Sequence, residues 1–224
     1  MQVHKGHRQR MKRRFLEHGL DNFDDVNVLE LLLFYADPRR DTNPLAHALL
    51  DQFGSLAGVL EAAPGDLEKI PGIGENAATL LRLIPEVSRR YMVTKTPETE
   101  PVETAAQAGR YFLHRFMYQR EEMIQALYLD ARRRPICCRE LGQGVVNAVE
   151  IRTRRLVEQA LETRCSAVIL AHNHPSGLAL PSLEDESATR LMKDALQLVG
   201  VELWDHVIVA GCEYVSMRES GLIR

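Results

Sequence analysis

Residues 167–186, AVILAHNHPSGLALPSLEDE, decide the fold class and the principal site of this 224-residue chain. The stretch begins with an apolar run over residues 167–171, which predicts a buried strand. His172 and His174 follow at once, and alternate residues of an extended backbone point the same way. The sequence therefore predicts two imidazoles that converge at the end of a core strand.

A third ligand is available where the next helix is expected to begin. Pro175 and Gly177 turn the chain, Ser182 is a typical N-cap, and Asp185 falls in the first helical turn. Ser182 and Asp185 by themselves would indicate only a helix cap with an acid favoured by the helix dipole. Two histidines and one carboxylate with an open fourth position are typical of catalytic zinc, which lowers the pKa of a bound water toward about 7. Together these residues predict a Zn²⁺ site.

The pattern around this stretch predicts an α/β domain over residues 104–224. Apolar runs predict strands at 122–129, 135–141, 167–171, 207–210 and 214–217, and helical periodicity predicts helices at 104–116, 150–162 and 185–199. Strands and helices alternate without a strictly parallel repeat, so we expect a mixed β-sheet flanked by helices.

Residues 1–92 predict a small all-α domain. Helices are expected at 26–36, 43–53, 55–60, 66–70 and 75–91, with Gly54 closing the second and Pro85 kinking or breaking the last. Residues 93–103 are polar and contain two prolines, which is typical of a linker, so the domain boundary is expected there.

Residues 67–77, LEKIPGIGENA, predict a helix-hairpin-helix in the first domain. Gly72 and Gly74 would let the turn expose backbone N–H groups at the start of the next helix. Such a turn binds one phosphate and could hold a DNA backbone without reading bases. Residues 1–92 contain 12 Lys and Arg against 13 Asp and Glu, a formal charge of −1, and only residues 5–14 form a clearly basic arm. A hairpin that only packs is an equally good interpretation.

The composition limits the classes of protein to consider. The formal net charge of −3 argues against a general polycation, and the apolar runs are too short to cross a membrane. The basic N-terminus lacks the apolar segment of a secretory signal. The four cysteines have no metal-site or disulfide-framework spacing, which favours free thiols in a reducing compartment. We expect a cytoplasmic protein with no membrane partner, and the sequence does not indicate its oligomeric state.

The motif His172-x-His174-Pro175-x6-Ser182-x2-Asp185 resembles the JAMM motif of MPN+ metalloproteases. The segments AHNHPSG, PSLEDESATRLMKDAL and VELWDHVIVA resemble the bacterial RadC proteins, and the resemblance covers nearly the whole chain. It implies an N-terminal helix-hairpin-helix region followed by a JAB (MPN) domain. It also implies that His172, His174 and Asp185 bind zinc, and that Ser182 assists the attacking water or the developing oxyanion.

The same resemblance implies a catalytic glutamate at the start of the first strand. Glu122 matches that place and is preferred over Glu121, because only one of two consecutive strand residues can face the metal. Asn173 stands where JAMM deubiquitinases usually carry Ser or Thr, which leaves the substrate open. Asp205 and His206 also match the family pattern, either as hydrogen-bond partners of the ligands or, as the favoured alternative, as a structural pair.

Three functions follow from these features. The first is a zinc-dependent hydrolase that cuts peptide or isopeptide bonds in a protein or peptide substrate. The second is a DNA-associated factor of repair or recombination, which rests on the hairpin and on the family resemblance. The third is a non-catalytic MPN scaffold, which the complete ligand set disfavours because scaffolds of this fold usually lose the ligands.

Overall fold

The computed structural model describes residues 6–95, 100–143, 149–175 and 177–223. The chain forms two compact units, Met1–Ser88 and Arg89–Arg224. In the described part of the chain, no helix is both long enough and apolar enough to cross a membrane.

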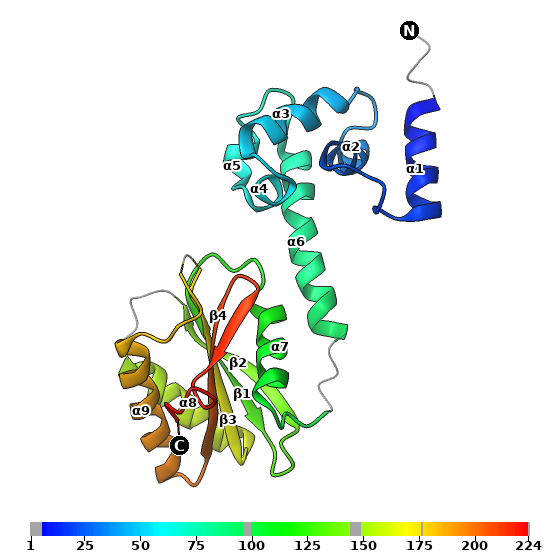
Figure 1. Ribbon diagram of the computed structural model, residues 1–224. Helices are drawn as coiled ribbons and strands as arrows, with labels where there is room; N and C mark the ends of the chain where they lie inside the picture. The colour runs from blue at the N-terminus through cyan, green and yellow to red at the C-terminus, as the bar shows by residue number, and fades with distance from the viewer. Residues whose placement is uncertain (1–5, 96–99, 144–148, 176, 224) are drawn as a thin grey trace. The chain divides into compact units, whose positions relative to one another are not determined.

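The second unit is built on a mixed sheet, which Figure 1 shows with its helices. The described strands are β1 (Met123–Leu129), β2 (Pro135–Gln143), β3 (Ala167–Asn173), β4 (Glu202–Ala210) and β5 (Glu213–Ser216). Their order across the sheet is β2-β1-β3-β4-β5. β3 is the central strand, antiparallel to β1 and parallel to β4. The predicted histidines therefore lie at the end of the central strand.

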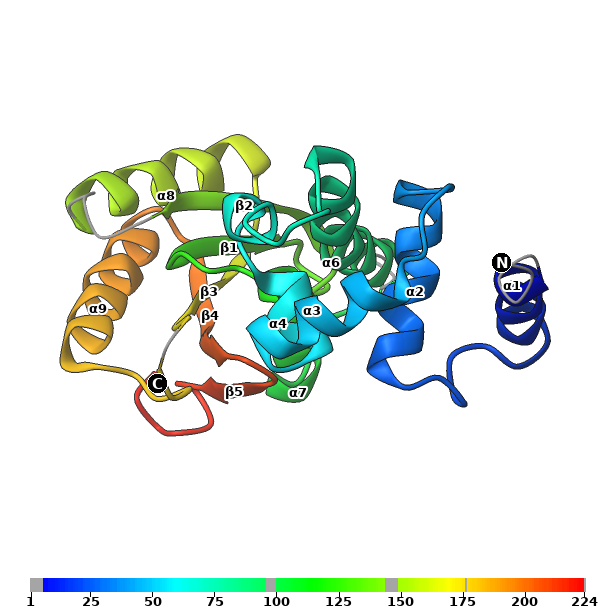
Figure 2. The same cartoon turned by 90° about the horizontal axis from the view of Figure 1, so that it is seen from above.

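Helices cover both faces of this sheet. The helices are α7 (Ala105–Phe116), α8 (Val149–Thr163) and α9 (Leu183–Leu198). α8 and α9 lie on one face and α7 on the other (Figure 2). Leu156 of α8 and Leu196 of α9 pack with Val168 of β3, and all three are fully buried. Burial of each such side chain stabilises the fold by about 1.5–3 kcal/mol, so the alternating side chains of β3 anchor the central strand from both sides.

β4 is longer than the sequence predicts. The apolar run indicates a strand over residues 207–210, whereas β4 begins at Glu202. The difference comes from Asp205 and His206, two polar residues that are buried inside the sheet and interrupt the apolar run. A buried polar residue needs hydrogen-bond partners. Asp205 and His206 have different partners, which are described with the site.

The first unit is helical. Its helices are α1 (His7–His18), α2 (Asp25–Ala36), α3 (Asn43–Phe53), α4 (Leu56–Glu61), α5 (Pro64–Leu67) and α6 (Glu75–Lys95), the last of which continues past the limit of the unit. Leu33 of α2, Leu49 of α3 and Leu81 of α6 are fully buried in one apolar core. The predicted α/β class, with a helical N-terminal region before a mixed sheet, is confirmed.

The basic N-terminal arm is a helix whose cations contact α2. The guanidinium of Arg8 lies 4.6 Å from the ring centre of Phe34 and also donates to the carbonyl of Asp37. Arg14 lies 4.0 Å from the ring centre of Phe23. Cation–π contacts of this kind stabilise packing, so these two cations belong to the fold of the first unit.

α6 corrects two details of the sequence prediction. Pro85 lies buried inside this continuous 21-residue helix, so of the two expected outcomes the break does not occur and the kink stays a prediction. α6 also continues to Lys95, so residues 93–95 of the expected linker are helical. Residues 96–99 of that linker lie outside the described residues, and the domain boundary at 93–103 stays a prediction. Gly54 does close α3, in a left-handed conformation with φ of 81°.

Candidate metal centre

His172 and His174 lie on the α8/α9 face of the sheet, at the end of β3. The side chain of His172 is 4% exposed and that of His174 is 23% exposed. Their Nε2 atoms are 2.9 Å apart. The β3 backbone therefore brings both imidazole edges to one point, as the alternation of strand side chains requires.

Asp185 reaches the same point from the first turn of α9. Its Oδ1 lies 3.2 Å from Nε2 of His172, and its Oδ2 lies 3.5 Å from Nε2 of His174. One potential ligand atom from each of the three residues lies within 4.8 Å of the others. Two imidazole nitrogens and a carboxylate oxygen match the donor set of a catalytic zinc site.

Ser182 fixes the carboxylate in place. Its Oγ accepts from the backbone N–H of Asp185 at 3.1 Å, and Oδ2 of Asp185 accepts from the N–H and the hydroxyl of Ser182 at 2.8 and 2.7 Å. This reciprocal arrangement is a capping box, which stabilises the start of a helix. The Ser182 hydroxyl thus donates to Asp185 in this structure, and its predicted action on an oxyanion stays a prediction.

Electrostatics favour an ionised Asp185. Burial acts to raise the pKa of this carboxyl group, but the hydrogen bond and charge from His172, together with hydrogen bonds from Ser182, hold it well below its usual range. A carboxylate beside two imidazoles is the ionisation state that a divalent cation needs from its ligands.

The outer nitrogen of each histidine has a partner of its own. Nδ1 of His174 lies 3.1 Å from the carbonyl of Leu178, which can only accept, so Nδ1 carries the proton. Nδ1 of His172 lies 2.9 Å from Nε2 of His206. Because a neutral imidazole with a protonated Nδ1 keeps a lone pair on Nε2, the lone pair of His174 points into the cluster.

For His172, a chain of hydrogen bonds through Thr189 and His206 likewise places the proton on Nδ1. The hydroxyl of Thr189 donates to the carbonyl of Asp185 at 2.6 Å, so its oxygen accepts from Nδ1 of His206 at 2.6 Å. Burial lowers the pKa of His206 well below its usual range, which favours its neutral form. Nε2 of His206 must then accept from Nδ1 of His172. With both imidazoles neutral, the two inner nitrogens present lone pairs next to a carboxylate, an arrangement that a bound cation would stabilise. Without a metal, a proton on Nε2 of His172 takes the place of the cation and donates to Asp185.

The neighbouring residue Asp205 serves the fold. Its carboxylate accepts from the hydroxyl of Ser216 at 2.6 Å, and from the backbone N–H groups of His206 and Arg218 at 2.7 and 3.0 Å. The bonds from Ser216 and Arg218 join β4 to the end of β5 and to the segment that follows it. The sequence treated Asp205 and His206 as one pair, but the structure separates them, since only His206 contacts a histidine of the cluster.

The predicted base, Glu122, lies one residue before β1. The register pairs Ile124 of β1 with His172 of β3. The backbone pairing ends there, but strand alternation continued by two residues would set Glu122 opposite His174 with its side chain on the same face of the sheet. Glu121 falls on the other face and is exposed, whereas Glu122 is half-buried. The register favours Glu122 over Glu121, and its action as a base stays a prediction.

The roles of two residues of this site, Thr189 and Asn173, could not be identified from the sequence. Thr189 lies four residues after Asp185, so helical periodicity sets both on one side of α9, but a threonine in a helix is not a distinctive signal. Asn173 was noted only as a departure from a pattern, whereas its buried side chain bonds the backbone of Glu121 and Met123.

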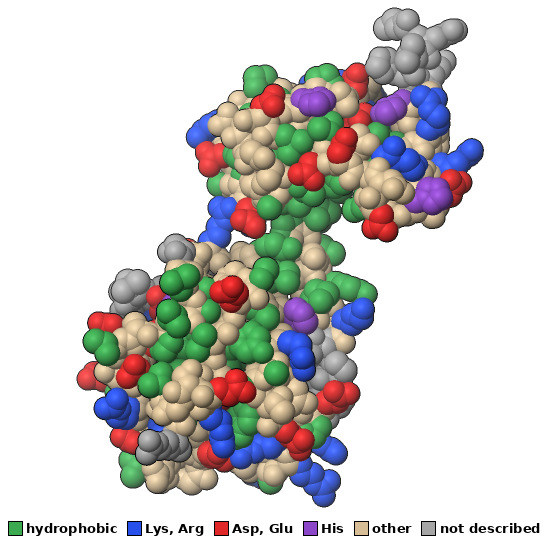
Figure 3. Space-filling model, in the orientation of Figure 1, with side chains coloured by type: hydrophobic (Ala, Val, Ile, Leu, Met, Phe, Trp, Pro, Cys, Tyr) green, Lys and Arg blue, Asp and Glu red, His purple; other side chains and the backbone are tan. Residues whose placement is uncertain are grey.

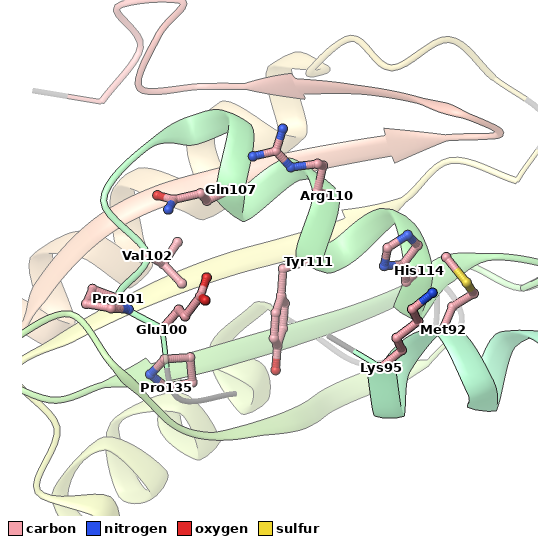
Figure 4. Close-up of a pocket in the computed structure, with 10 residues that line it drawn as sticks. All are labelled: Met92, Lys95, Glu100, Pro101, Val102, Gln107, Arg110, Tyr111, His114 and Pro135. Atoms are coloured by element: carbon pink, nitrogen blue, oxygen red, sulfur yellow. The ribbon is translucent and has the colours of Figure 1, made fainter. Parts of the chain in front are cut away.

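A hollow of about 410 Å³ lies beside α7, on the face of the sheet away from His172 and His174. Figure 4 shows Tyr111 pointing into it between polar and apolar side chains. Its lining consists of Met92, Lys95, Glu100, Pro101, Val102, Gln107, Arg110, Tyr111, His114 and Pro135. Because it shares no residue with the histidine cluster, it plays no part in the chemistry considered below.

The predicted hairpin lies in the first unit, between α5 and α6. Gly72 has φ of 99°, and a Cβ there would come within 2.8 Å of Leu45, so both conformation and space call for glycine. A Cβ at Gly74 would meet no heavy atom within 4 Å. On the face seen in Figure 3, basic and acidic side chains are intermixed over this unit. Only Gly72 of the two glycines has a positive φ, and both the exposure of backbone N–H groups and DNA contact at Gly72 and Gly74 stay predictions.

Comparison with known proteins finds a family model for the second part of the chain and relatives that span nearly all of it. Residues 102–222 match the family model described as a RadC-like JAB domain. A UPF0758 protein of Burkholderia cenocepacia is 37% identical over 95% of this chain and 83% of its own length. A UPF0758 protein of Bordetella parapertussis is 37% identical over 94% of this chain and 93% of its own length.

Proposed function

Because this chain belongs to the RadC family of proteins with a RadC-like JAB domain, we propose that it is a zinc-dependent hydrolase. His172, His174 and Asp185 hold the metal in this proposal. The observation that carries it is the convergence of two imidazole nitrogens and a carboxylate, with each outer imidazole nitrogen bonded to a separate partner. Histidine ligands of metal sites typically have such outer partners.

The proposed reaction is hydrolysis of a peptide or isopeptide bond. When bound, zinc would polarise the scissile carbonyl and promote ionisation of water at neutral pH. Glu122 would accept a proton from the attacking water and return it to the leaving amine, the usual task of a general base. Ser182 would turn its hydroxyl from Asp185 toward the developing oxyanion. The chemical class of the substrate is a proposal that rests on the family resemblance.

Zinc content and peptide cleavage test this proposal together. The purified protein should retain zinc, and His172→Ala should lose it. A peptide library made by digestion of a bacterial proteome should be cleaved by the zinc-loaded wild type. Glu122→Gln should keep the zinc and cleave at least about a hundredfold more slowly, since general-base catalysis is typically worth about 10²–10⁴-fold.

Glu121→Gln is the matched control, because it changes the adjacent carboxylate on the opposite face of the sheet. It should cleave at nearly the wild-type rate. Wild-type protein without zinc, or equal cleavage by Glu122→Gln and the wild type, would contradict the proposal. In the second case cleavage would not depend on Glu122. Bound zinc without cleavage by either protein would favour the scaffold function instead.

A second candidate function is DNA binding by the first unit. The left-handed Gly72 and the free space at Gly74, directly before the 21-residue helix α6, support it. Binding to duplex DNA should weaken as salt increases. Gly74→Ala should weaken it further by crowding the approach of a phosphate without disturbing the fold. Absence of binding at low salt would exclude this function.

A further inference from the structure

Asn173 separates the two histidines, yet its side chain belongs to the other face of the sheet. It is the last residue of β3 and is 4% exposed. Strand alternation sets it with Ala171 and Ile169, which pack in the core beneath α7. The side chain therefore does not face the metal cluster, and another role must account for a buried amide at this position.

The amide joins β3 to the residues just before and at the start of β1. Its Oδ1 accepts from the backbone N–H of Met123 at 2.8 Å, and its Nδ2 donates to the backbone carbonyl of Glu121 at 3.0 Å. A backbone N–H can only donate and a carbonyl can only accept, so these partners also fix which amide atom is oxygen. Both bonds span about fifty residues of sequence, which makes them a tertiary link.

These bonds continue the sheet where the backbone ladder stops. The β1–β3 pairing runs from Leu129–Ala167 to Ile124–His172. Beyond that pair, the Asn173 amide acts as a substitute peptide group and bonds the chain on both sides of Glu122. A residue whose two neighbours are both held has little freedom to turn its backbone.

We propose that Asn173 is a positioning residue that holds Glu122 toward the His172/His174 cluster by bonding the backbone on both sides of it. This inference rests on the proposed function, since it assigns a task to the glutamate of that site. It also explains why an asparagine stands between the histidines. The end of β3 then supplies two metal ligands, His172 and His174, on one face of the sheet. Asn173, which lies between them, aligns the base Glu122.

The chemistry at position 173 is selective. The site needs one acceptor and one donor at the spacing of a primary amide. Aspartate has the same shape but offers only acceptors, so one oxygen would oppose the Glu121 carbonyl. Serine is shorter and has one hydroxyl, and alanine has neither group. Leaving the buried Met123 N–H without a partner is costly, and the partly buried Glu121 carbonyl adds to that cost.

The first measurement uses metal-free protein. Backbone hydrogen exchange at Met123, followed by NMR, should accelerate by about tenfold or more in Asn173→Ala, because the N–H loses its acceptor. Asn173→Asp keeps that acceptor and should change the rate less. Tyr128→Phe removes a hydrogen bond to Gln159 from the same strand and is the matched control, which should leave Met123 unchanged.

The second measurement asks whether Glu122 still senses the metal. The carboxyl carbon signal of Glu122, assigned by its loss in Glu122→Gln, should shift when zinc is added to the wild type. In Asn173→Asp and Asn173→Ala this shift should fall by at least about half, while zinc affinity changes by less than about tenfold, the lower end of the effect of a residue that bonds a ligand. A residue that only stabilised the fold would not move this signal selectively.

The outcomes separate this inference from the proposed function. Unchanged Met123 exchange in Asn173→Ala, or a wild-type zinc response of Glu122 in both variants, would overturn the positioning role while leaving the metal centre intact. A wild-type protein that binds no zinc would overturn the proposed function and the role of Asn173 with it, whatever the exchange at Met123. Accelerated exchange together with a diminished zinc response supports the inference.

Discussion

Each unit of this protein holds a carboxylate beside histidine, but the hydrogen-bonding groups of the two clusters are satisfied in opposite ways. In the first unit, Glu30 is 1% exposed, its Oε1 accepts from Nε2 of His7 at 2.9 Å, and its Oε2 accepts from Nδ2 of Asn43 at 3.1 Å. Each oxygen meets a donor, so the cluster is complete without an added ion. Such an arrangement stabilises a fold.

At the end of β3 the same residue types face one another through lone pairs. The outer nitrogens of His172 and His174 are bonded elsewhere, so in the neutral imidazoles both inner nitrogens are acceptors that face the carboxylate of Asp185. Acceptors that converge on acceptors are stabilised by a cation. The direction of the imidazole lone pairs therefore distinguishes the metal site from the structural cluster. The presence of an acid beside histidine does not, because both clusters have it.

The largest effect is expected in the helical unit. Glu30→Ala should lower the free energy of unfolding of that unit by about 2 kcal/mol, because it leaves the Asn43 amide and the His7 imidazole without their buried acceptor. Zinc binding should not change. Glu30→Gln, which retains the shape and one acceptor, is the milder control and should cost less.

The two units can be followed separately in denaturant. The single tryptophan of the chain, Trp204, is buried in β4 of the second unit. Tryptophan fluorescence therefore reports the second unit, and far-ultraviolet circular dichroism reports helices of both. Glu30→Ala should shift the circular dichroism transition and leave the fluorescence transition in place. Equal shifts of both would show that the Glu30 cluster stabilises more than its own unit.

The second prediction concerns the partners behind the ligands. Thr189→Val conserves shape but removes the hydroxyl that orients His206, so His206 can donate from Nε2 and turn the His172 lone pair away from the metal. Zinc affinity should fall by about tenfold, equivalent to about 1.4 kcal/mol. Competition with a chromophoric chelator would measure it.

Thr153 provides a matched control in α8. Its hydroxyl bonds the carbonyl of Val149 four residues earlier, just as Thr189 bonds Asp185, but the bond belongs to a different helix. Thr153→Val should leave zinc affinity unchanged. If both valine variants weaken zinc equally, the effect of Thr189 comes from helix stability and the relay through His206 is wrong.

The sequence predicted those parts of the molecule that depend on local pattern. The strand at 167–171, the cap at Ser182 and the acid in the first turn of α9 follow from periodicity and spacing, and the structure has all three. The convergence of His172 and His174 followed from strand alternation alone. These features require only neighbours in sequence.

Features that depend on distant neighbours were not predictable in this way. The first half of β4 was missed because Asp205 and His206 look unfit for a sheet until their partners Ser216 and His172 are known. α1 looked like a solvated basic arm because its contacts with the rings of α2 are tertiary. The amide of Asn173 bonds residues about fifty positions away, and no local pattern indicates such a link.

The smallest expected effect is a pH dependence of stability, which tests the contrast between the two carboxylate–histidine clusters. In metal-free protein, the folded pKa of Asp185 lies below its usual value, so its ionised form stabilises the fold. That stability is present above the unfolded pKa and is lost as pH falls through the folded pKa, because the unfolded chain binds the proton first. Relative to Asp185→Asn, the wild type should be more stable by about 1 kcal/mol near pH 6, and the difference should shrink as pH falls from about 5 to about 3.

Urea unfolding at each pH would measure it, with Glu184→Gln as the control for removing an exposed acid from the same helical turn. A difference that stays constant or grows toward low pH would mean that the carboxylate is not stabilised by His172 and Ser182, and the contrast between the two clusters would lose its electrostatic basis.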